Sequence, residues 1–119
     1  MRVLQKISQY GEDLTLFCPV EKCCYNTAGW EIWDPLLRTI FDDVRNVSLS
    51  KDFKYTAAVK NDGYNLTIRH IEPQDINKTY SCLYGVTRSE KIILTEENVF
   101  KSKFELNKEL YLKIKRQTE

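Results

Sequence analysis

The chain has 119 residues and a mass of 14.1 kDa, which is the size of one ordinary domain and excludes a second independent hydrophobic core. Hydrophobic residues make up 42% and charged residues 29% of the sequence, which excludes a disordered chain. The formal net charge of +1 excludes the strong basic field of a nucleic-acid-binding protein, so any partner must be recognised by a local patch.

Short runs of alternating apolar and polar residues recur about every ten positions between turn residues, a pattern typical of an all-β protein. The first such run is 13–19, in which Leu14, Leu16 and Cys18 fall on one face. This pattern predicts a half-buried strand with Cys18 directed inward.

A β-hairpin is predicted in the middle of the chain. The runs 53–59 and 64–70 both alternate, and the segment between them contains Asp62-Gly63. An Asp-Gly pair favours a tight turn because glycine readily adopts positive φ. This is the clearest local prediction in the sequence.

The next strand is predicted at 79–85. Alternation places Tyr80, Cys82 and Tyr84 on one face and directs Leu83 outward. The two cysteine-bearing strands therefore both present a cysteine to the interior.

The C-terminal part allows two interpretations. Either 91–95 is the last strand and a stalk follows, or 109–115 is the last strand and 86–108 form a long excursion. We expect residues 1–98 to form the domain, and residues 99–119 to form a C-terminal strand extension or a membrane-proximal stalk.

The four cysteines and the single histidine, His70, fit a disulfide-containing extracellular domain better than a cytosolic protein. Four cysteines allow three pairings. They lack the paired Cys-x-x-Cys or Cys/His spacing that brings four ligands to one zinc ion. We therefore expect no metal and no other cofactor.

The spacing of cysteine and aromatic residues resembles the immunoglobulin superfamily. Cys82 follows Cys18 by 64 residues, Trp30 and Trp33 follow Cys18 by 12 and 15 residues, and Tyr80 precedes Cys82 by two. The combination is similar to a variable-like or intermediate-set domain of a cell-surface immune receptor. The resemblance implies an all-β, immunoglobulin-like two-sheet Greek-key sandwich, a Cys18–Cys82 disulfide, and Tyr80 at the tyrosine corner.

Further residues carry this resemblance. Leu66 and Ile68, followed by Ile71 and Asp75, resemble the family's run from strand E to the turn before strand F, so Leu66 and Ile68 are expected in the core. Asp75 lies seven residues before Cys82, which makes this corner one residue longer than the usual pattern. The sequence after Cys82 also lacks the Gly-x-Gly bulge of rearranged antigen receptors.

Once Cys18 and Cys82 are paired, three states remain open for the adjacent Cys23 and Cys24. They can form a vicinal disulfide, stay free, or link a second chain covalently.

The buried tryptophan is expected to be Trp30. An inward Trp30 makes Ile32 inward as well, whereas an inward Trp33 would bury Glu31. Trp33 is then expected to face solvent, where it would be an aromatic anchor for a protein partner.

The resemblance implies that ligands bind to the sheet containing strands G, F, C and C′. The expected ligand-binding residues are Trp33, Leu36, Leu37 and Arg38 in the CC′ region and Leu83, Tyr84 and Arg88 in the FG region.

Three Asn-x-Ser/Thr sequences, at Asn46, Asn65 and Asn77, are candidate N-glycosylation sites. Asn65 and Asn77 are expected on the opposite sheet or at the lower end of the sandwich. Glycans there would leave the GFCC′ sheet bare for a partner.

We expect the function to be recognition and not catalysis, since His70 has no nucleophile at a recognised spacing and no HExxH, GxSxG or phosphate loop is present. The expected partner is a protein ligand or counter-receptor, with no nucleic acid. The alternatives are homophilic adhesion or a homodimer, and a secreted or viral decoy.

The expected location is the extracellular side of the plasma membrane, or a secreted form. No apolar run approaches the roughly 18 residues of a membrane helix, and no signal-peptide core follows Met1. We therefore expect membrane attachment only through a segment outside this sequence.

Overall fold

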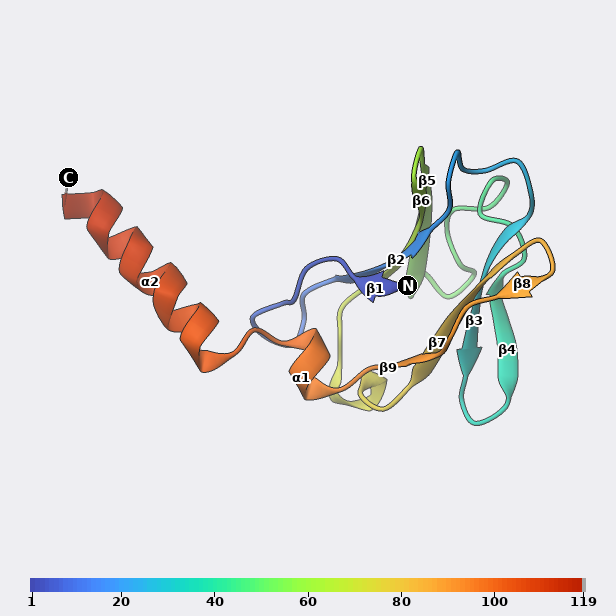
Figure 1. Cartoon of the computed structure of the whole chain (residues 1–119). Helices are drawn as coiled ribbons and strands as arrows, with labels where there is room; N and C mark the ends of the chain where they lie inside the picture. Colours follow the sequence, from blue (N-terminus) through green and yellow to red (C-terminus); the bar gives the residue numbers. More distant parts are fainter. Residues whose placement is uncertain (119) are drawn as a thin grey trace.

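A computed structural model describes residues 1–118 and shows two antiparallel sheets packed face to face (Figure 1). The first sheet has the order β1 (Arg2–Val3), β2 (Leu14–Pro19), β6 (Gly63–Ile68) and β5 (Tyr55–Lys60). The second contains β4 (Leu37–Phe41), β3 (Ala28–Trp33) and β7 (Thr79–Tyr84), and both β8 (Thr87–Arg88) and β9 (Ile92–Ile93) pair with β7. This immunoglobulin-like sandwich confirms the predicted fold class.

The core lies between the sheets. Cys18 on β2 is joined to Cys82 on β7 with their Cα atoms 6.3 Å apart, which confirms the predicted link between the sheets. Trp30 is fully buried, and its ring meets that of Tyr64 edge to face at 5.5 Å between centroids. Leu66 and Ile68 are also fully buried. Alternation along each strand thus supplies one inward face to a shared core.

The predicted hairpin consists of β5 and β6, with Lys60 opposite Gly63. Gly63 is needed for close packing: a Cβ at this position would collide with the carbonyl oxygen of Cys18 and the ring of Phe17. The glycine therefore allows β6 to lie flat against β2.

An ion pair between Asp75 and Lys54 stabilises the corner before β7. A short 3₁₀ turn, Pro73–Asp75, ends at the buried Asp75, which accepts a hydrogen bond from Lys54 Nζ at 2.8 Å. The Tyr80 hydroxyl lies 3.1 Å from the Tyr55 hydroxyl. The tyrosine at this corner thus has the hydroxyl of another buried tyrosine as its hydrogen-bond partner.

Of the two alternatives for the C-terminal part, the structure has a last short strand at β9, within 91–95, and the alternative of a last strand at 109–115 is wrong. Helix α1 (Glu96–Val99) follows β9, and α2 (Lys103–Thr118) covers the region in which Leu110, Leu112 and Ile114 alternate. A helix satisfies its own backbone hydrogen bonds, whereas a strand there needs a neighbouring sheet edge.

The folded body also extends slightly beyond the expected boundary at residue 98. Val99 is fully buried, and Lys101 donates its backbone N–H to the carbonyl of Ile7 at 2.8 Å. Helix α2 begins two residues later and projects away from the sandwich (Figure 1). Within residues 1–118, no helix has the length and apolar character needed to cross a bilayer.

Candidate functional site

The sheet of β3, β4, β7, β8 and β9 has an outer surface that we call the GFCC′ face, in which β3 is strand C, β4 is C′, β7 is F, and β8 and β9 together take the place of G. Its central residues alternate with the core residues Trp30, Ile32, Tyr80 and Cys82. The residues on the face are Glu31, Trp33, Leu37, Ser81, Leu83 and Arg88.

An ion pair stands at the centre of this face. Arg88 Nε donates to Glu31 Oε1 at 2.7 Å, and Arg88 Nη2 donates to Glu31 Oε2 at 3.0 Å. The hydrogen bond from Arg88 lowers the pKa of Glu31 below its ordinary value, although burial acts in the opposite direction. Ser81 Oγ donates to Glu31 Oε1 at 3.3 Å. The carboxylate is thus held ionised by two side chains, Ser81 on the adjacent strand β7 and Arg88 on β8 beyond it.

Glu31 is 5% exposed even though it points outward. The Arg88 side chain bonds to both of its oxygens and replaces the water that an isolated carboxylate would require.

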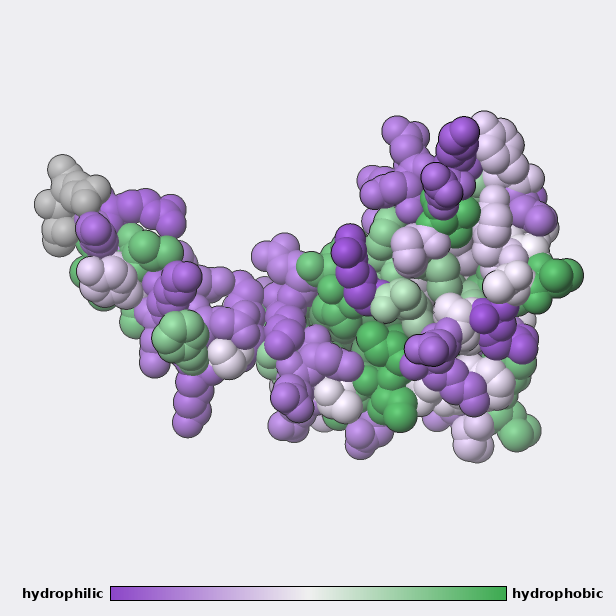
Figure 2. All heavy atoms as spheres, viewed as in Figure 1, coloured by the Kyte–Doolittle hydropathy of each residue, from purple (hydrophilic) through white to green (hydrophobic). Residues whose placement is uncertain are grey.

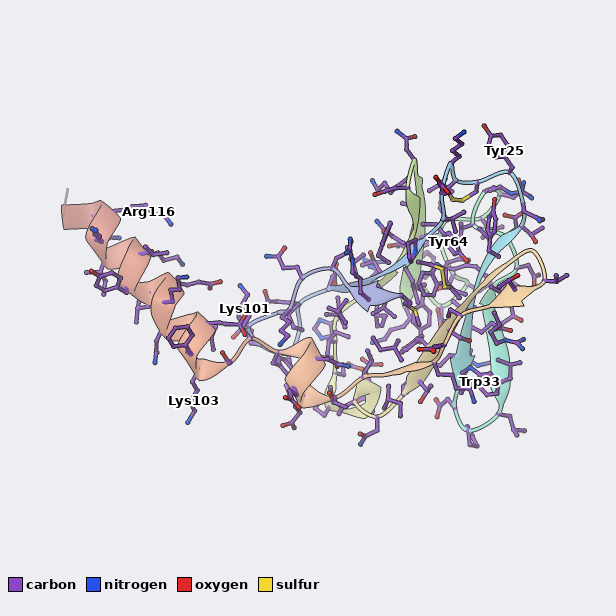
Figure 3. All side chains as sticks on the ribbon, in the orientation of Figure 1. Tyr25, Trp33, Tyr64, Lys101, Lys103 and Arg116 are labelled. Atoms are coloured by element: carbon purple, nitrogen blue, oxygen red, sulfur yellow. A yellow bond between two sulfur atoms is a disulfide. The ribbon has the colours of Figure 1, made fainter. Side chains whose placement is uncertain are left out.

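Trp33 lies beside this ion pair on the outer face of the sheet and is half-buried. Tyr64, by contrast, lies in the interior of the sandwich (Figure 3). Its indole Nε1 donates to Ser81 Oγ at 3.1 Å. Lys91 Nζ lies 3.6 Å from the centroid of the indole ring, and the Arg88 guanidinium carbon lies 5.9 Å from it. The aromatic ring is thus fixed by one hydrogen bond and two cation–π contacts.

Exposed apolar side chains surround this centre. Leu36 in the β3–β4 turn and Val86 in the β7–β8 turn are largely or fully exposed, and Leu37 on β4 and Ile93 on β9 are about half exposed. Figure 2 shows hydrophobic groups at the two turns. The face thus combines a rigid aromatic and charged centre with an apolar surround, which is the composition of many protein interfaces.

Two of the expected ligand-binding residues are not on this face. The Tyr84 hydroxyl accepts hydrogen bonds from the backbone N–H groups of Tyr25 at 2.9 Å and Asn26 at 3.0 Å, so it fixes the segment before β3. Arg38 lies on the opposite side of β4 from Leu37, because successive residues of a strand alternate. The structure therefore brings together Trp33, Leu36, Leu37, Leu83 and Arg88, and leaves out Tyr84 and Arg38.

Arg38 lines a groove of about 600 Å³ at the open edge of the sandwich. Other walls of this groove are formed by Phe41, Asn46, Leu49 and Tyr55. Asp43, at its rim, is bound by Arg45, whose hydrogen bonds lower the pKa of the carboxyl to about 2. Among residues 1–118, no three His, Cys, Asp or Glu side chains are close enough to hold a metal ion.

The three glycosylation sequences lie on different parts of the sandwich. Asn46 borders the groove beside β4, and Asn77 is exposed in the corner before β7. Asn65 lies on the outer side of β6 but is recessed, because its Oδ1 is buried within a hollow formed partly by Leu4 and Lys6.

The remaining cysteines occur in the segment between β2 and β3. Cys23 and Cys24 are bonded to each other, so all four cysteines within the described residues are in disulfides. Of the three states that the sequence allowed, the structure has the vicinal pair.

Sequence reasoning did not identify Glu31, Ser81, Lys91 or Ile93 as parts of the site. Glu31 and Arg88 are 57 positions apart, and their contact follows from the register of three strands. The sequence did contain one signal that Glu31 belongs to the site, because Glu31 occupies an outward position on the strand that carries both tryptophans.

Comparison with known proteins agrees with the fold. No family model matches the chain. The chain is 34% identical over 95 residues to vascular endothelial growth factor receptor 1 of Homo sapiens; the aligned region covers 79% of this chain and 7% of that receptor. The chain thus spans a small part of the receptor's length. With the disulfide-linked sandwich, this similarity supports an immunoglobulin-like receptor domain.

Proposed function

We propose that this chain is an extracellular recognition domain of a cell-surface receptor, and that it binds a protein partner through the GFCC′ face. The similarity to vascular endothelial growth factor receptor 1 supports a receptor domain, and its name describes a receptor for a protein growth factor. The assignment to an immune receptor stays a prediction from the sequence resemblance. A non-enzymatic role fits both the fold and the receptor similarity.

The observation that carries this proposal is the fixed position of Trp33 amid exposed apolar residues. Its ring is held by Ser81 and Lys91, and Arg88 is held by Glu31. Side chains already fixed in the free protein lose little conformational entropy when a partner binds. Tryptophan and arginine are also the residue types most enriched at the energetic centres of interfaces.

The test uses two substitutions matched in exposure. Leu37 on the GFCC′ face and Val59 on the other sheet are each 41% exposed and both lie on strands. Thermal unfolding of both variants checks that each remains folded, because Val59 lies opposite the buried Tyr64. The wild type, Leu37→Asp and Val59→Asp are made as tetramers and applied to an array of extracellular protein domains.

We expect the wild type and Val59→Asp to bind the same array protein and Leu37→Asp to lose that binding. Loss with Val59→Asp alone would place the interface on the other sheet. Concentration-dependent self-association that is removed by Leu37→Asp, with no binding on the array, would replace this proposal with a homophilic function.

A further inference from the structure

The groove beside β4 lies between that strand and the segment that leads into β5. This segment covers the edge of β5, because the carbonyl of Ser48 accepts the backbone N–H of Ala57 at 2.9 Å. A second bond of 2.9 Å runs from the N–H of Ser50 to the carbonyl of Tyr55. Within residues 1–118, β4 pairs with β3 on one side and with no strand on the other. One sheet edge is thus covered by the chain itself, and the edge at β4 is left open.

The open edge of β4 is poorly suited to pairing with another strand. An exposed strand edge presents free backbone groups, and natural proteins usually cover, charge or twist such an edge. The register between β3 and β4 shifts at Trp30 and Glu31. A bulge of this kind twists an edge strand and interrupts a regular ladder with a peptide or a second copy. The groove therefore favours an occupant that is not a β-strand.

The groove has the size and the apolar surface of a small-molecule site. Its volume of about 600 Å³ lies in the range of about 300–1,000 Å³ that is typical of such sites. Val47 and Leu49, both in its walls, are 51% and 41% exposed. An occupant that packs on these side chains would remove apolar surface from water.

The charges in the walls of the groove balance each other. Asp43 is already neutralised by Arg45 at 2.6 Å. The other charged side chains in the walls are two basic and two acidic residues: Arg38, Lys51, Asp42 and Asp52. A neutral occupant with several hydroxyl or amide groups therefore fits the groove better than a charged one.

Asn46 is exposed and lies in the wall of this groove. Its backbone N–H bonds to the carbonyl of Asp43 at 3.2 Å, which places it in the turn that follows β4. It begins Asn46-Val47-Ser48, an acceptor sequence for N-glycosylation. A sugar attached to Asn46 therefore starts at the groove.

We propose that the first sugars of an N-glycan on Asn46 occupy the groove and cover the open edge of β4. On attachment, an oligosaccharide moves from a polyprenyl pyrophosphate to Nδ2 of Asn46. The C–O bond to pyrophosphate breaks, a C–N bond forms, and the amide nitrogen gives up one proton. The C–H groups of N-acetylglucosamine would pack on Val47 and Leu49, and its hydroxyl and acetamide oxygens would accept hydrogen bonds from Arg38 and Lys51.

This inference rests on the extracellular location in the proposed function and is independent of the partner at the GFCC′ face. Asn77 supplies an internal comparison, because its backbone N–H bonds to the carbonyl of Leu94, next to β9. Strands β9 and β4 lie on opposite edges of the same sheet. A glycan on Asn77 would therefore report secretion without covering β4.

The test is hydrogen–deuterium exchange, measured by mass spectrometry, on protein secreted by a glycosylating host. Ser48→Ala removes the acceptor sequence and keeps both Asn46 and the charge of the groove. We expect the β4 amides of the glycosylated wild type to exchange about threefold to tenfold more slowly than those of Ser48→Ala. This ratio is the effect expected of one added hydrogen bond. The same two proteins made without glycans should exchange alike.

Matched variants show whether the sugar lies in the groove. Leu49→Ser, in the groove wall, should reduce the ratio of β4 exchange between the glycosylated and unglycosylated forms. Val59→Ser, equally exposed but on β5, should leave that ratio unchanged. Asn77→Gly removes the other glycan and tolerates the positive φ of 74° at that position, and should also leave β4 exchange unchanged.

Three results would overturn the proposal. The first is an empty Asn46; if Asn77 is occupied in the same sample, the extracellular location stands and this inference alone fails. The second is equal β4 exchange in the glycosylated wild type and in Ser48→Ala. The third is protection of β4 that increases with protein concentration, which would identify a second copy as the occupant.

Discussion

Arg88 holds the Glu31 carboxylate through two hydrogen bonds, of 2.7 and 3.0 Å, on the outer surface of the sheet that contains β3, β7 and β8. The pair neutralises a buried carboxylate and at the same time fixes an arginine beside Trp33. One interaction thus serves both the stability of the sheet and the shape of the proposed interface.

The Glu31 carboxyl should make part of the domain's stability depend on pH. Its pKa is lowered in the folded protein, so its contribution is present above its unfolded value, about 4.3, and is lost as pH falls through the folded value. Glu31→Gln should therefore flatten the decrease in unfolding free energy on acidification. The unfolding free energy of the variant should still decrease somewhat in acid, because the pKa of Asp43 is also lowered, to about 2.

Urea unfolding of wild type and Glu31→Gln between neutral pH and pH 3 measures this effect. Glu97→Gln, on an exposed part of α1, is the control. Parallel pH curves for wild type and Glu31→Gln would show that the ion pair adds no stability.

The Cys18–Cys82 disulfide should supply a large part of the stability. It closes a loop with a sequence separation of 64 residues, for which the chain-entropy relation gives about 4 kcal/mol. The double substitution Cys18→Ala/Cys82→Ala should thus leave the chain mostly unfolded at 37 °C, as measured by thermal unfolding. A midpoint within a few degrees of the wild type would mean that the core alone holds the sheets together.

Asp75 should be essential for the corner before β7. It is 1% exposed, accepts from Lys54 Nζ at 2.8 Å, and lies 3.7 Å from Lys78 Nζ. Asp75→Asn keeps the volume but removes the charge, and should lower the unfolding free energy by about 1.5–3 kcal/mol. Denaturant unfolding gives this value, with Asp62→Asn in the exposed hairpin turn as the control. Equal losses for the two variants would contradict the assigned role of Asp75.

Glycans are expected at Asn46 and Asn77, and least at Asn65. The first two side chains are exposed, whereas the Oδ1 of Asn65 is buried beneath the N-terminal segment. Glycopeptide mass spectrometry of protein secreted by a glycosylating host measures the occupancy of each site. Full occupancy of Asn65 with empty Asn46 and Asn77 would be the opposite result.

Local patterns were sufficient to predict much of the sandwich. The alternation before Cys18, the Asp62-Gly63 pair and the alternation around Cys82 predicted β2, the β5–β6 hairpin and β7. Each of these signals lies within about ten residues, and the period of two for a strand is strongly constrained when one face is buried. The Cys18–Cys82 link followed from the family resemblance and is confirmed.

The sequence left the C-terminal part open between a stalk and a strand, because Leu110, Leu112 and Ile114 imitate a strand. The stronger signal was Ser102 with Glu105 three residues later, the capping box that begins helix α2. The centre of the GFCC′ face was missed for a different reason. The contacts of Glu31 with Arg88 and of Trp33 with Lys91 span 57 and 58 positions and depend on strand register.

The most direct measurement compares binding and stability in Trp33→Ala, using the array protein that the wild type binds. Because Trp33 is half-buried at the surface and not in the core, its removal should lower the unfolding free energy by about 1 kcal/mol or less. The same change should weaken binding by about 30-fold or more, the effect of an interface hot spot. Unchanged affinity, or a stability loss large enough to account for lost binding, would contradict a partner-binding role for the GFCC′ face.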